Sequence, residues 1–190
     1  MENCEIIPIR PPGARFNYGD YLLLPECRRH EIIDGVLSPV PSPGTAHQRI
    51  SLKLSAALLK HVQERNLGSV LEAPCDVVLS YENVLQPDIL FVRKERAGII
   101  REMNVLGVPD LVVEILSNGS RGKDVRVKRR AYAGFCVPEY WIVDPEAASI
   151  EILVWSELGY ISAGVWTSPQ RLVSPLLPEV KRCLAGIFKD

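Results

Sequence analysis

The chain has 190 residues, of which 47% are hydrophobic and 24% are charged, a usage that is ordinary for globular proteins and excludes a wholly disordered chain. Its 22 lysines and arginines nearly balance its 23 aspartates and glutamates, so it does not coat nucleic acid by bulk charge. The apolar runs are too short for a transmembrane helix, and residues 1–13 lack the apolar segment of a signal peptide. We therefore expect no membrane partner.

The N-terminal part of the chain predicts little regular structure before residue 30. Residues 1–16 are rich in proline and arginine, so we expect an irregular arm there, and 17–26 has the pattern of a short helix. The apolar segments 30–33 and 36–40 flank Asp34-Gly35. An Asp-Gly pair between two such segments is a strong signal for a β-hairpin.

The longest predicted helix follows the hairpin and covers 46–66. Its apolar residues recur at helical spacing and form one stripe, which comprises Ile50, Leu54, Ala57, Leu58 and Val62. Three segments rich in valine, isoleucine and leucine come next and are predicted as strands: 75–79, 88–92 and 111–116. The last two are almost continuously apolar, which is typical of strands buried on both faces.

The remaining part of the chain alternates between helix and strand. A helix is predicted over 123–133 and a buried strand over 139–143; 148–166 has the pattern of two or three antiparallel strands, and 177–188 that of a final helix. The middle of the chain therefore has the order α-β-β-β-α-β. A helix that crosses over between the last two strands makes them parallel. We expect an α/β fold over 17–190, a single domain whose mixed sheet has helices on both faces.

The five cysteines are scattered through the chain and form no Cys-x-x-Cys pair. Their odd number and wide spacing argue against a zinc module and a disulfide framework, and they fit the reducing conditions of the cytoplasm, where we expect the protein to be located. Glycine-rich phosphate loops and the HExxH and GxSxG motifs are absent as well.

Two acidic residues lie in the apolar strands. Asp88 begins the strand 88–92, and Glu114 has apolar neighbours on both sides in 111–116. A charge in a buried strand costs free energy unless it is paired or binds a metal, although Asp88 can also point into solvent from a strand end. On neighbouring strands the two carboxylates can meet, and they would form the all-oxygen site that Mg²⁺ or Mn²⁺ accepts. Asp110 competes as a partner of Glu114, but the two lie about 13 Å apart along one strand.

A polar stripe follows on the helix predicted over 123–133. Asp124, Lys128 and Tyr132 recur every four residues and so share one face. This face is either an exposed ion pair or is turned to the carboxylates, where the Lys128 ammonium would orient a water or offset charge on a phosphate. The same helix carries four further basic residues, which form either a patch for a phosphate backbone or a solvated basic face: Lys123, Arg126, Arg129 and Arg130.

Two more polar residues have a structural and a functional interpretation. His47 lies in the first turn of the long helix, on nearly the same face as Leu54, and a histidine in that position more often has a structural role than a catalytic one. Glu31 belongs to the hairpin, where a surface position is the plainer interpretation.

Together these residues resemble the Uma-type restriction endonucleases, which belong to the PD-(D/E)XK or restriction-endonuclease-like superfamily. The resemblance covers about residues 17–155 and rests on short motifs in a fixed order: Glu31-Ile-Ile-Asp-Gly35, His47 at a helix start, Gln86-Pro87-Asp88, Pro109-Asp110-Leu-Val-Val-Glu114-Ile115-Leu116-Ser117, Asp124…Lys128…Tyr132 and Glu139-Tyr-Trp-Ile-Val-Asp-Pro145. It implies the superfamily's αβββαβ core, which is the order of elements predicted above, with the hairpin and the C-terminal strands as additions.

The resemblance also implies a metal site. The motif Asp and Glu of the superfamily hold Mg²⁺, which activates a water for phosphodiester hydrolysis. By position these residues are Asp88 and Glu114, and the backbone carbonyl of Ile115 would be a further ligand. Glu31 and His47 match recurrent positions of the family, which implies a further carboxylate near the metal and a pocket residue.

One position departs from the superfamily pattern. The Glu-x-Lys motif would place a lysine at position 116, where this chain has Leu116. In the Uma-type group the lysine has moved to the following helix, so the resemblance implies that Lys128 takes its place.

We therefore expect a Mg²⁺-dependent or Mn²⁺-dependent endonuclease that acts on phosphodiester bonds in DNA. Several nucleases of the superfamily are dimers, and the C-terminal strands with Trp155, Tyr160 and Trp166 suggest a homodimer interface. The alternative is a non-catalytic nucleic-acid-binding or protein-interaction module descended from a nuclease, which the near-neutral charge and the absent lysine at position 116 favour. A metal-dependent enzyme for a small phosphorylated substrate is a third candidate.

Overall fold

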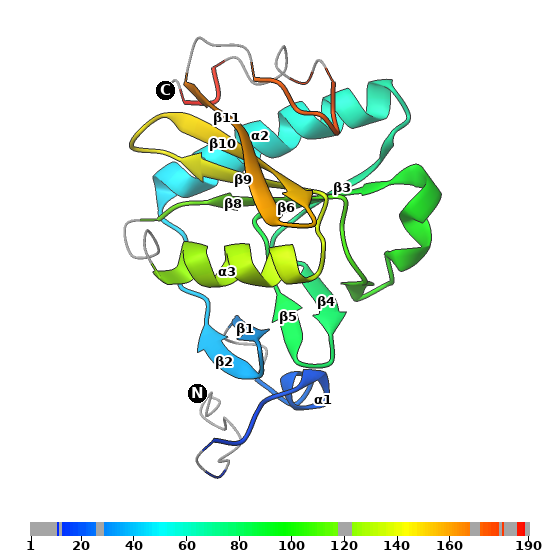
Figure 1. The fold of residues 1–190 in the computed structure, drawn as a ribbon, viewed down its shortest axis with the longest axis vertical. Helices are drawn as coiled ribbons and strands as arrows, with labels where there is room; N and C mark the ends of the chain where they lie inside the picture. The colour runs from blue at the N-terminus through cyan, green and yellow to red at the C-terminus, as the bar shows by residue number, and fades with distance from the viewer. Residues whose placement is uncertain are drawn as a thin grey trace.

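A computed structural model describes residues 11, 13–25, 29–117, 123–167, 172–178, 180 and 186–188 of the chain. Its strands form two sheets, a larger one of six strands and a smaller one of five. The smaller sheet lies at the N-terminal end of the molecule, and the larger sheet and both long helices form the rest (Figure 1).

The larger sheet has the strand order β11-β10-β9-β8-β6-β3. Its strands are β3 (Gly68–Glu72), β6 (Ile89–Arg93), β8 (Leu111–Ile115), β9 (Glu139–Asp144), β10 (Ser149–Ser156) and β11 (Gly159–Thr167). Strands β8 and β9 are parallel and are connected through α3 (Lys123–Gly134), whereas every other neighbouring pair is antiparallel. The predicted crossover is therefore confirmed.

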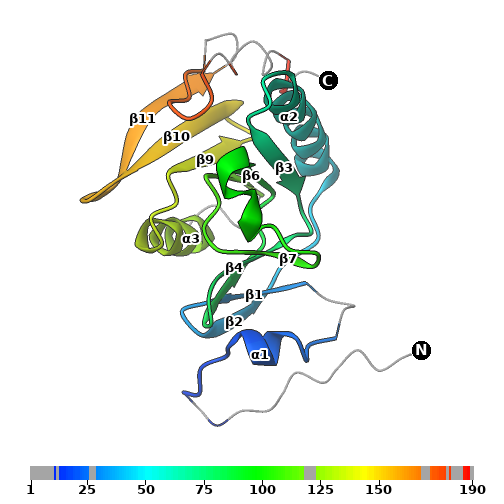
Figure 2. The ribbon, with the colours of Figure 1, turned by 90° about the vertical axis from the view of Figure 1, so that its right-hand side faces the viewer.

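Helices cover both faces of this sheet. Figure 2 shows the sheet between α2 (Thr45–Glu64) and α3. The predicted stripe of α2 packs through Leu54 and Leu58 against Phe91 and Val113 of the sheet, and all four side chains are buried. Each such side chain contributes about 1.5–3 kcal/mol to the free energy of unfolding. The opposite face of the sheet buries Tyr132 of α3.

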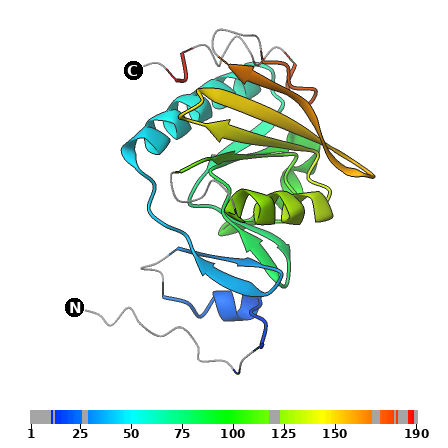
Figure 3. The same cartoon turned by 60° about the vertical axis from the view of Figure 1, so that its left-hand side comes forward.

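The smaller sheet has the order β2-β1-β5-β4-β7. Its elements are β1 (His30–Ile33), β2 (Val36–Pro39), β4 (Asp76–Ser80), β5 (Asn83–Leu85) and β7 (Asn104–Leu106), with α1 (Tyr18–Tyr21) beside them and η1 (Lys94–Ile99) leading to β7. Asp34 and Gly35 have φ angles of 49° and 71°, the left-handed conformation that a two-residue type I′ hairpin requires. Figure 3 shows the segment that leads from this hairpin to α2.

The αβββαβ order is confirmed, but its first strand differs from the prediction. The core consists of α2, β3, β6, β8, α3 and β9, whereas the predicted strand 75–79 is β4 of the smaller sheet. Strand β3 was not predicted, because this edge strand is only half buried and so lacks a long apolar run. Strands β5 and β7, which have three residues each, were not predicted either.

Both ends of the chain differ from their predictions in extent. Helix α1 ends at Tyr21, earlier than the predicted residue 26, because Pro25 disfavours helical backbone at the residue before it. Most of the predicted arm 1–16 lies outside the described residues, as do six of the twelve residues of the predicted helix 177–188. None of the six described residues of that segment is α-helical. None of the described helices combines the length and apolar character needed to cross a bilayer.

Candidate active site

The two acidic residues in apolar strands meet at the end of β6. Ile89 of β6 pairs with Val113 of the antiparallel strand β8. Continuing this register by one residue places Asp88 opposite Glu114, and opposite residues of antiparallel strands have Cα atoms about 4.5–5.5 Å apart with side chains on the same face. The predicted proximity of the two carboxylates is therefore built into the pairing of β6 with β8.

Asp88 is held by two contacts at one oxygen. Its Oδ2 accepts a hydrogen bond from the backbone N–H of Ile115 at 2.7 Å and lies 3.1 Å from His47 Nε2. Both contacts leave Oδ1 without a partner among the described residues. His47 comes from the first turn of α2, so α2 and β8 together fix the orientation of this carboxylate.

Glu114 is held from the other side by α3. Lys128 Nζ donates to both of its carboxylate oxygens, at 3.1 and 3.0 Å, and the Tyr132 hydroxyl donates to Oε1 at 2.7 Å. Residue Lys128 is only 7% exposed. Residues four apart share a helix face, so the predicted polar stripe is turned toward the carboxylates at Lys128 and Tyr132. The side chain of its third member, Asp124, lies outside the described residues.

Glu31 reaches the same cluster from the smaller sheet. Its Oε1 lies 2.9 Å from Lys128 Nζ and accepts a hydrogen bond from the backbone N–H of Gln86 at 2.8 Å. Lys128 thus bridges Glu31 of one sheet and Glu114 of the other, and Glu31 is buried. The geometry makes Glu31 a partner of the lysine; its implied place near a metal stays a prediction.

The cluster has one buried ammonium for three carboxylates. Burial, followed by the neighbouring charges of Asp88 and Glu31, raises the pKa of Glu114 to about 8, although Lys128 and Tyr132 act against this. Burial would lower the pKa of Lys128, but attraction by Glu114 and Glu31 outweighs it and raises that pKa. Burial and the same two carboxylates raise the pKa of Tyr132. Glu114 therefore tends to hold a proton unless further positive charge arrives.

The donor set fits a magnesium-type ion. Among the described residues no three histidines, cysteines, aspartates or glutamates form a cage for a metal. Mg²⁺ does not need one, since proteins commonly bind it through one or two carboxylates, with water and substrate phosphates as its other ligands. Asp88 and Glu114 supply the two carboxylates. The negative excess of the cluster and the unpartnered Oδ1 of Asp88 favour a divalent cation at this point.

A cavity of about 570 Å³ opens beside Asp88. Asp88 and His47 line it together with Glu72 and two arginines, Arg29 and Arg49. Asp88 is therefore accessible from the surface, whereas Glu114 lies deeper, covered by α3.

The described basic side chains among those predicted on α3 do not line this cavity. Arg126 and Arg130 are exposed, and each is two residues from Lys128, which is about 200° around the helix. Arg129 lies close enough to Tyr160 to act on its pKa. The side chains of Lys123 and Asp124 lie outside the described residues. Phosphate binding by these α3 residues stays a prediction.

Gln86 and Arg29 were missed by the sequence analysis. The buried Gln86 side chain donates to the Tyr21 hydroxyl and to Asp76 Oδ1, and its Oε1 accepts a hydrogen bond from Arg29 Nε at 2.7 Å. Gln86 belongs to the Gln-Pro-Asp motif, but nothing in the sequence indicates that its side chain forms several hydrogen bonds. Arg29 is one basic residue among 22 and gave no signal.

Comparisons with known proteins agree with this architecture. Residues 18–185 match the model of the Uma2 family, described as "Putative restriction endonuclease". The fold is similar to the crystal structure of "a putative nuclease belonging to DUF820" from Anabaena variabilis, with a TM-score of 0.72 and 18% sequence identity, over 91% of this chain and 97% of that one. Comparison with curated proteins gave no match. Since the family model covers most of its length, the chain belongs to the Uma2 family of restriction-endonuclease-like proteins.

Proposed function

We propose that this protein is an endonuclease that hydrolyses phosphodiester bonds in DNA and depends on Mg²⁺ or Mn²⁺. The proposal rests on the position of Asp88, one residue beyond the paired residues of β6 and β8, beside Glu114, whose pKa its charge raises. Lys128 binds Glu114 at 3.0 Å. Two carboxylates and one cation, of which Asp88 lines a cavity that also contains basic side chains, suit the hydrolysis of an anionic backbone.

The carboxylates of Asp88 and Glu114 and the carbonyl of Ile115 would hold the metal. The ion would supply a Lewis acid that activates water and offsets charge on the scissile phosphate. His47 and the Ile115 N–H orient Asp88 so that Oδ1 is left for ligands.

Lys128 keeps a second partner when Glu114 binds a cation. Its contact with Glu31 is 2.9 Å, so the ammonium stays in place beside the carboxylates. There it offsets negative charge that develops on a phosphate. Tyr132 holds Glu114 through a hydrogen bond at 2.7 Å and fixes the direction of its carboxylate.

The test compares metal binding and cleavage in three proteins. Calorimetric titration with Mn²⁺ and plasmid cleavage are measured for the wild type, for Asp88→Asn and for the control Glu102→Gln, whose exposed carboxylate lies outside the cluster. We expect Asp88→Asn to lose both metal binding and cleavage while the control keeps both. Circular dichroism verifies that each variant is folded.

The competing function is a non-catalytic binding module. It is favoured by one feature: the Lys128 and Tyr132 contacts cover the oxygens of Glu114. Wild type that binds an oligonucleotide but cleaves neither plasmid, single-stranded DNA nor RNA with either metal would support this function and contradict the nuclease.

A further inference from the structure

Arg29 is a half-buried cation with an unusual environment. Its Nε donates to the Gln86 side chain at 2.7 Å, and among the described residues no carboxylate forms an ion pair with it. A half-buried guanidinium normally has an anionic partner, because losing water around a charge costs free energy. The neutral amide of Gln86 fixes the position of the group but leaves its charge unbalanced.

The anchor of Arg29 is itself rigid. Gln86 is buried, and its side chain donates to Asp76 Oδ1 at 2.6 Å and to the Tyr21 hydroxyl at 3.0 Å. Its backbone N–H binds Glu31, the partner of Lys128. Gln86 thus orients Arg29 through its side chain and, through its backbone N–H, belongs to the network that holds Lys128.

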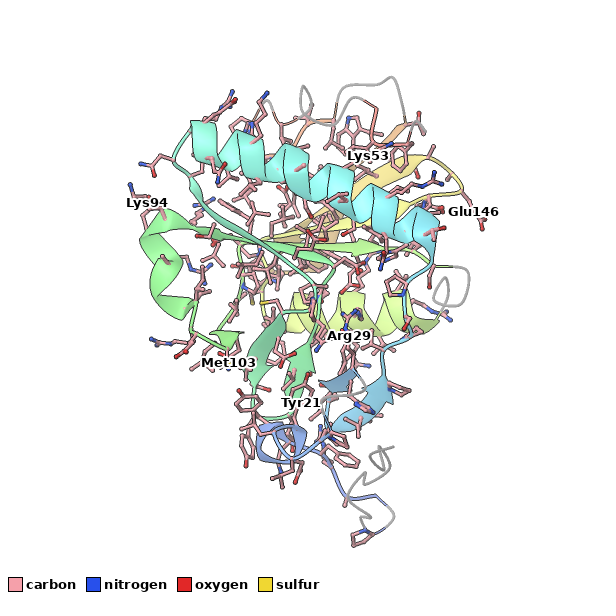
Figure 4. The ribbon with its side chains drawn as sticks, turned by 180° about the vertical axis from the view of Figure 1, so that it is seen from behind. Tyr21, Arg29, Lys53, Lys94, Met103 and Glu146 are labelled. Atoms are coloured by element: carbon pink, nitrogen blue, oxygen red, sulfur yellow. The ribbon has the colours of Figure 1, made fainter. Side chains whose placement is uncertain are left out.

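Arg29 also lies at the edge of the active site. It lines the cavity that contains Asp88 and His47, and Figure 4 shows it where the hairpin meets the main body of the molecule. Gln86 precedes Asp88 by two residues, a separation of at most about 7 Å along the chain. The guanidinium bound to Gln86 is therefore within reach of a phosphate that neighbours the one at Asp88.

We propose that Arg29 binds a backbone phosphate of the nucleic acid next to the scissile phosphate, and that Gln86 is the positioning residue for its guanidinium. The inference rests on the proposed function, because the scissile phosphate is assigned to the carboxylate pair. One N–H of the planar group is engaged by Gln86. The others form the fork that binds phosphate oxygens in pairs. Arg49 lines the same cavity and adds positive charge there.

Arg29→Ala and Arg65→Ala form a matched pair for the test. Arg65 follows the last turn of α2, the opposite end from His47, which is about 27 Å away along the helix. Both changes remove one positive charge. Binding of fluorescein-labelled single-stranded and duplex DNA is measured by anisotropy in EDTA, at several salt concentrations, so that no cleavage occurs. Thermal unfolding verifies that each variant is folded.

We expect Arg29→Ala to bind DNA about tenfold more weakly and to reduce the slope of log K against log salt by about one phosphate contact. Arg65→Ala should behave as the wild type. Arg29→Lys keeps the charge but loses the fork, so its affinity should lie between the two. In cleavage assays Arg29→Ala should raise KM with little change in kcat, since the contact is the same in the ground and transition states.

Failure of this inference can be told from failure of the nuclease assignment. If Arg29→Ala binds DNA as well as Arg65→Ala does while the wild type cleaves, the Arg29 site is wrong and the nuclease stands. If the wild type does not cleave but binds DNA through Arg29, the phosphate site stands without the nuclease. A final measurement is calorimetry with inorganic phosphate. If phosphate binds in an Arg29-dependent way and DNA does not bind, the ligand of Arg29 is not a nucleic-acid backbone.

Discussion

The two sheets make different contributions to the site. The larger sheet contributes Asp88 and Glu114, whose positions are fixed by the pairing of β6 with β8 and by burial on both faces. The smaller sheet contributes Glu31, which contacts the lysine. Arg29 and Gln86 adjoin the ends of its inner strands β1 and β5, and Arg29, bound to Gln86, lines the cavity. The proposed metal ligands thus come from the rigid core, and the groups around them from the small sheet.

This difference implies that the two sheets have separate roles, which mutations in each sheet can distinguish. Changes in the larger sheet should remove metal binding and chemistry together. Changes in the smaller sheet should leave the metal site intact and alter the placement of Lys128 or of the substrate. Besides the apolar clusters that contain side chains of both sheets, an ionic link joins them: the Lys128 ammonium contacts Glu31 and Glu114 at about the same distance.

The largest contrast is expected between two glutamates that share this lysine. Glu114→Gln should abolish Mn²⁺ binding in calorimetry and lower cleavage about a thousandfold, because a Lewis acid supplies several kcal/mol of stabilisation to the transition state. Glu31→Gln should bind Mn²⁺ as the wild type does and lose about 10-fold to 100-fold in rate, an effect typical of groups that orient a ligand. Loss of Mn²⁺ binding in Glu31→Gln would show instead that Glu31 itself binds the metal, a stronger role than the position near the metal that the family resemblance implied.

Removing the link itself should destabilise the fold. Lys128→Met leaves the buried carboxylates of Glu31 and Glu114 without their cation, and removing one partner of a buried ion pair costs about 3–5 kcal/mol. Urea unfolding at pH 8 measures the loss. The double variant Lys128→Met/Glu31→Gln also removes the negative charge of Glu31. It should therefore recover part of the free energy of unfolding that Lys128→Met loses. Equal stability of wild type and Lys128→Met would mean that the bridge contributes nothing to the joining of the sheets.

The pH dependence of metal binding tests the electrostatics of the larger sheet. The pKa of Glu114 is raised from 4.5 to about 8. Between these values the folded protein holds a proton that the unfolded chain has released, so this group's contribution to stability falls as pH rises through the window. A metal needs the ionised carboxylate, so Mn²⁺ affinity should rise up to tenfold per pH unit below about 8 and then level off.

Calorimetry in two buffers with different ionisation enthalpies counts the protons released. We expect about one proton per Mn²⁺ at pH 6 to 7 and almost none above the pKa of Glu114. If the Mn²⁺ affinity does not change between pH 6 and pH 8, Glu114 is already ionised over this range. The effect of Lys128 on the pKa of Glu114 then outweighs the effect of burial.

The sequence predicted the larger sheet and its carboxylates better than the smaller sheet. The apolar composition of strands such as β6 and β8 is enough to predict them. A charged residue within such a strand is conspicuous, because burying a charge costs free energy. The four-residue spacing on α3 correctly placed Lys128 and Tyr132 on one face. These signals are local and strong.

The smaller sheet gave weaker signals for a physical reason. Strands β5 and β7 have three residues each, too few to show a period, and the segment 75–79 was assigned to the wrong sheet. The network around Gln86 connects Arg29, Asp76 and Tyr21, which are up to 65 residues apart in the chain. Contacts between such distant polar residues depend on tertiary structure alone, so no spacing could have predicted them.

The smallest effect is expected on α3, where the sequence predicted contact with phosphates. Arg126 and Arg130 are exposed and lie away from the Lys128 face of α3, so we expect their charges to act on a bound DNA only through solvent, where salt screens them. Arg126→Ala/Arg130→Ala should weaken DNA binding in anisotropy about twofold to threefold, mainly through a slower association rate. Although this variant removes two charges and Arg29→Ala removes one, the single change should cost more affinity, because a fixed guanidinium at the cavity makes a direct contact. A larger loss in the α3 variant would place the DNA across the exposed surface of α3, and would move the substrate path away from the smaller sheet.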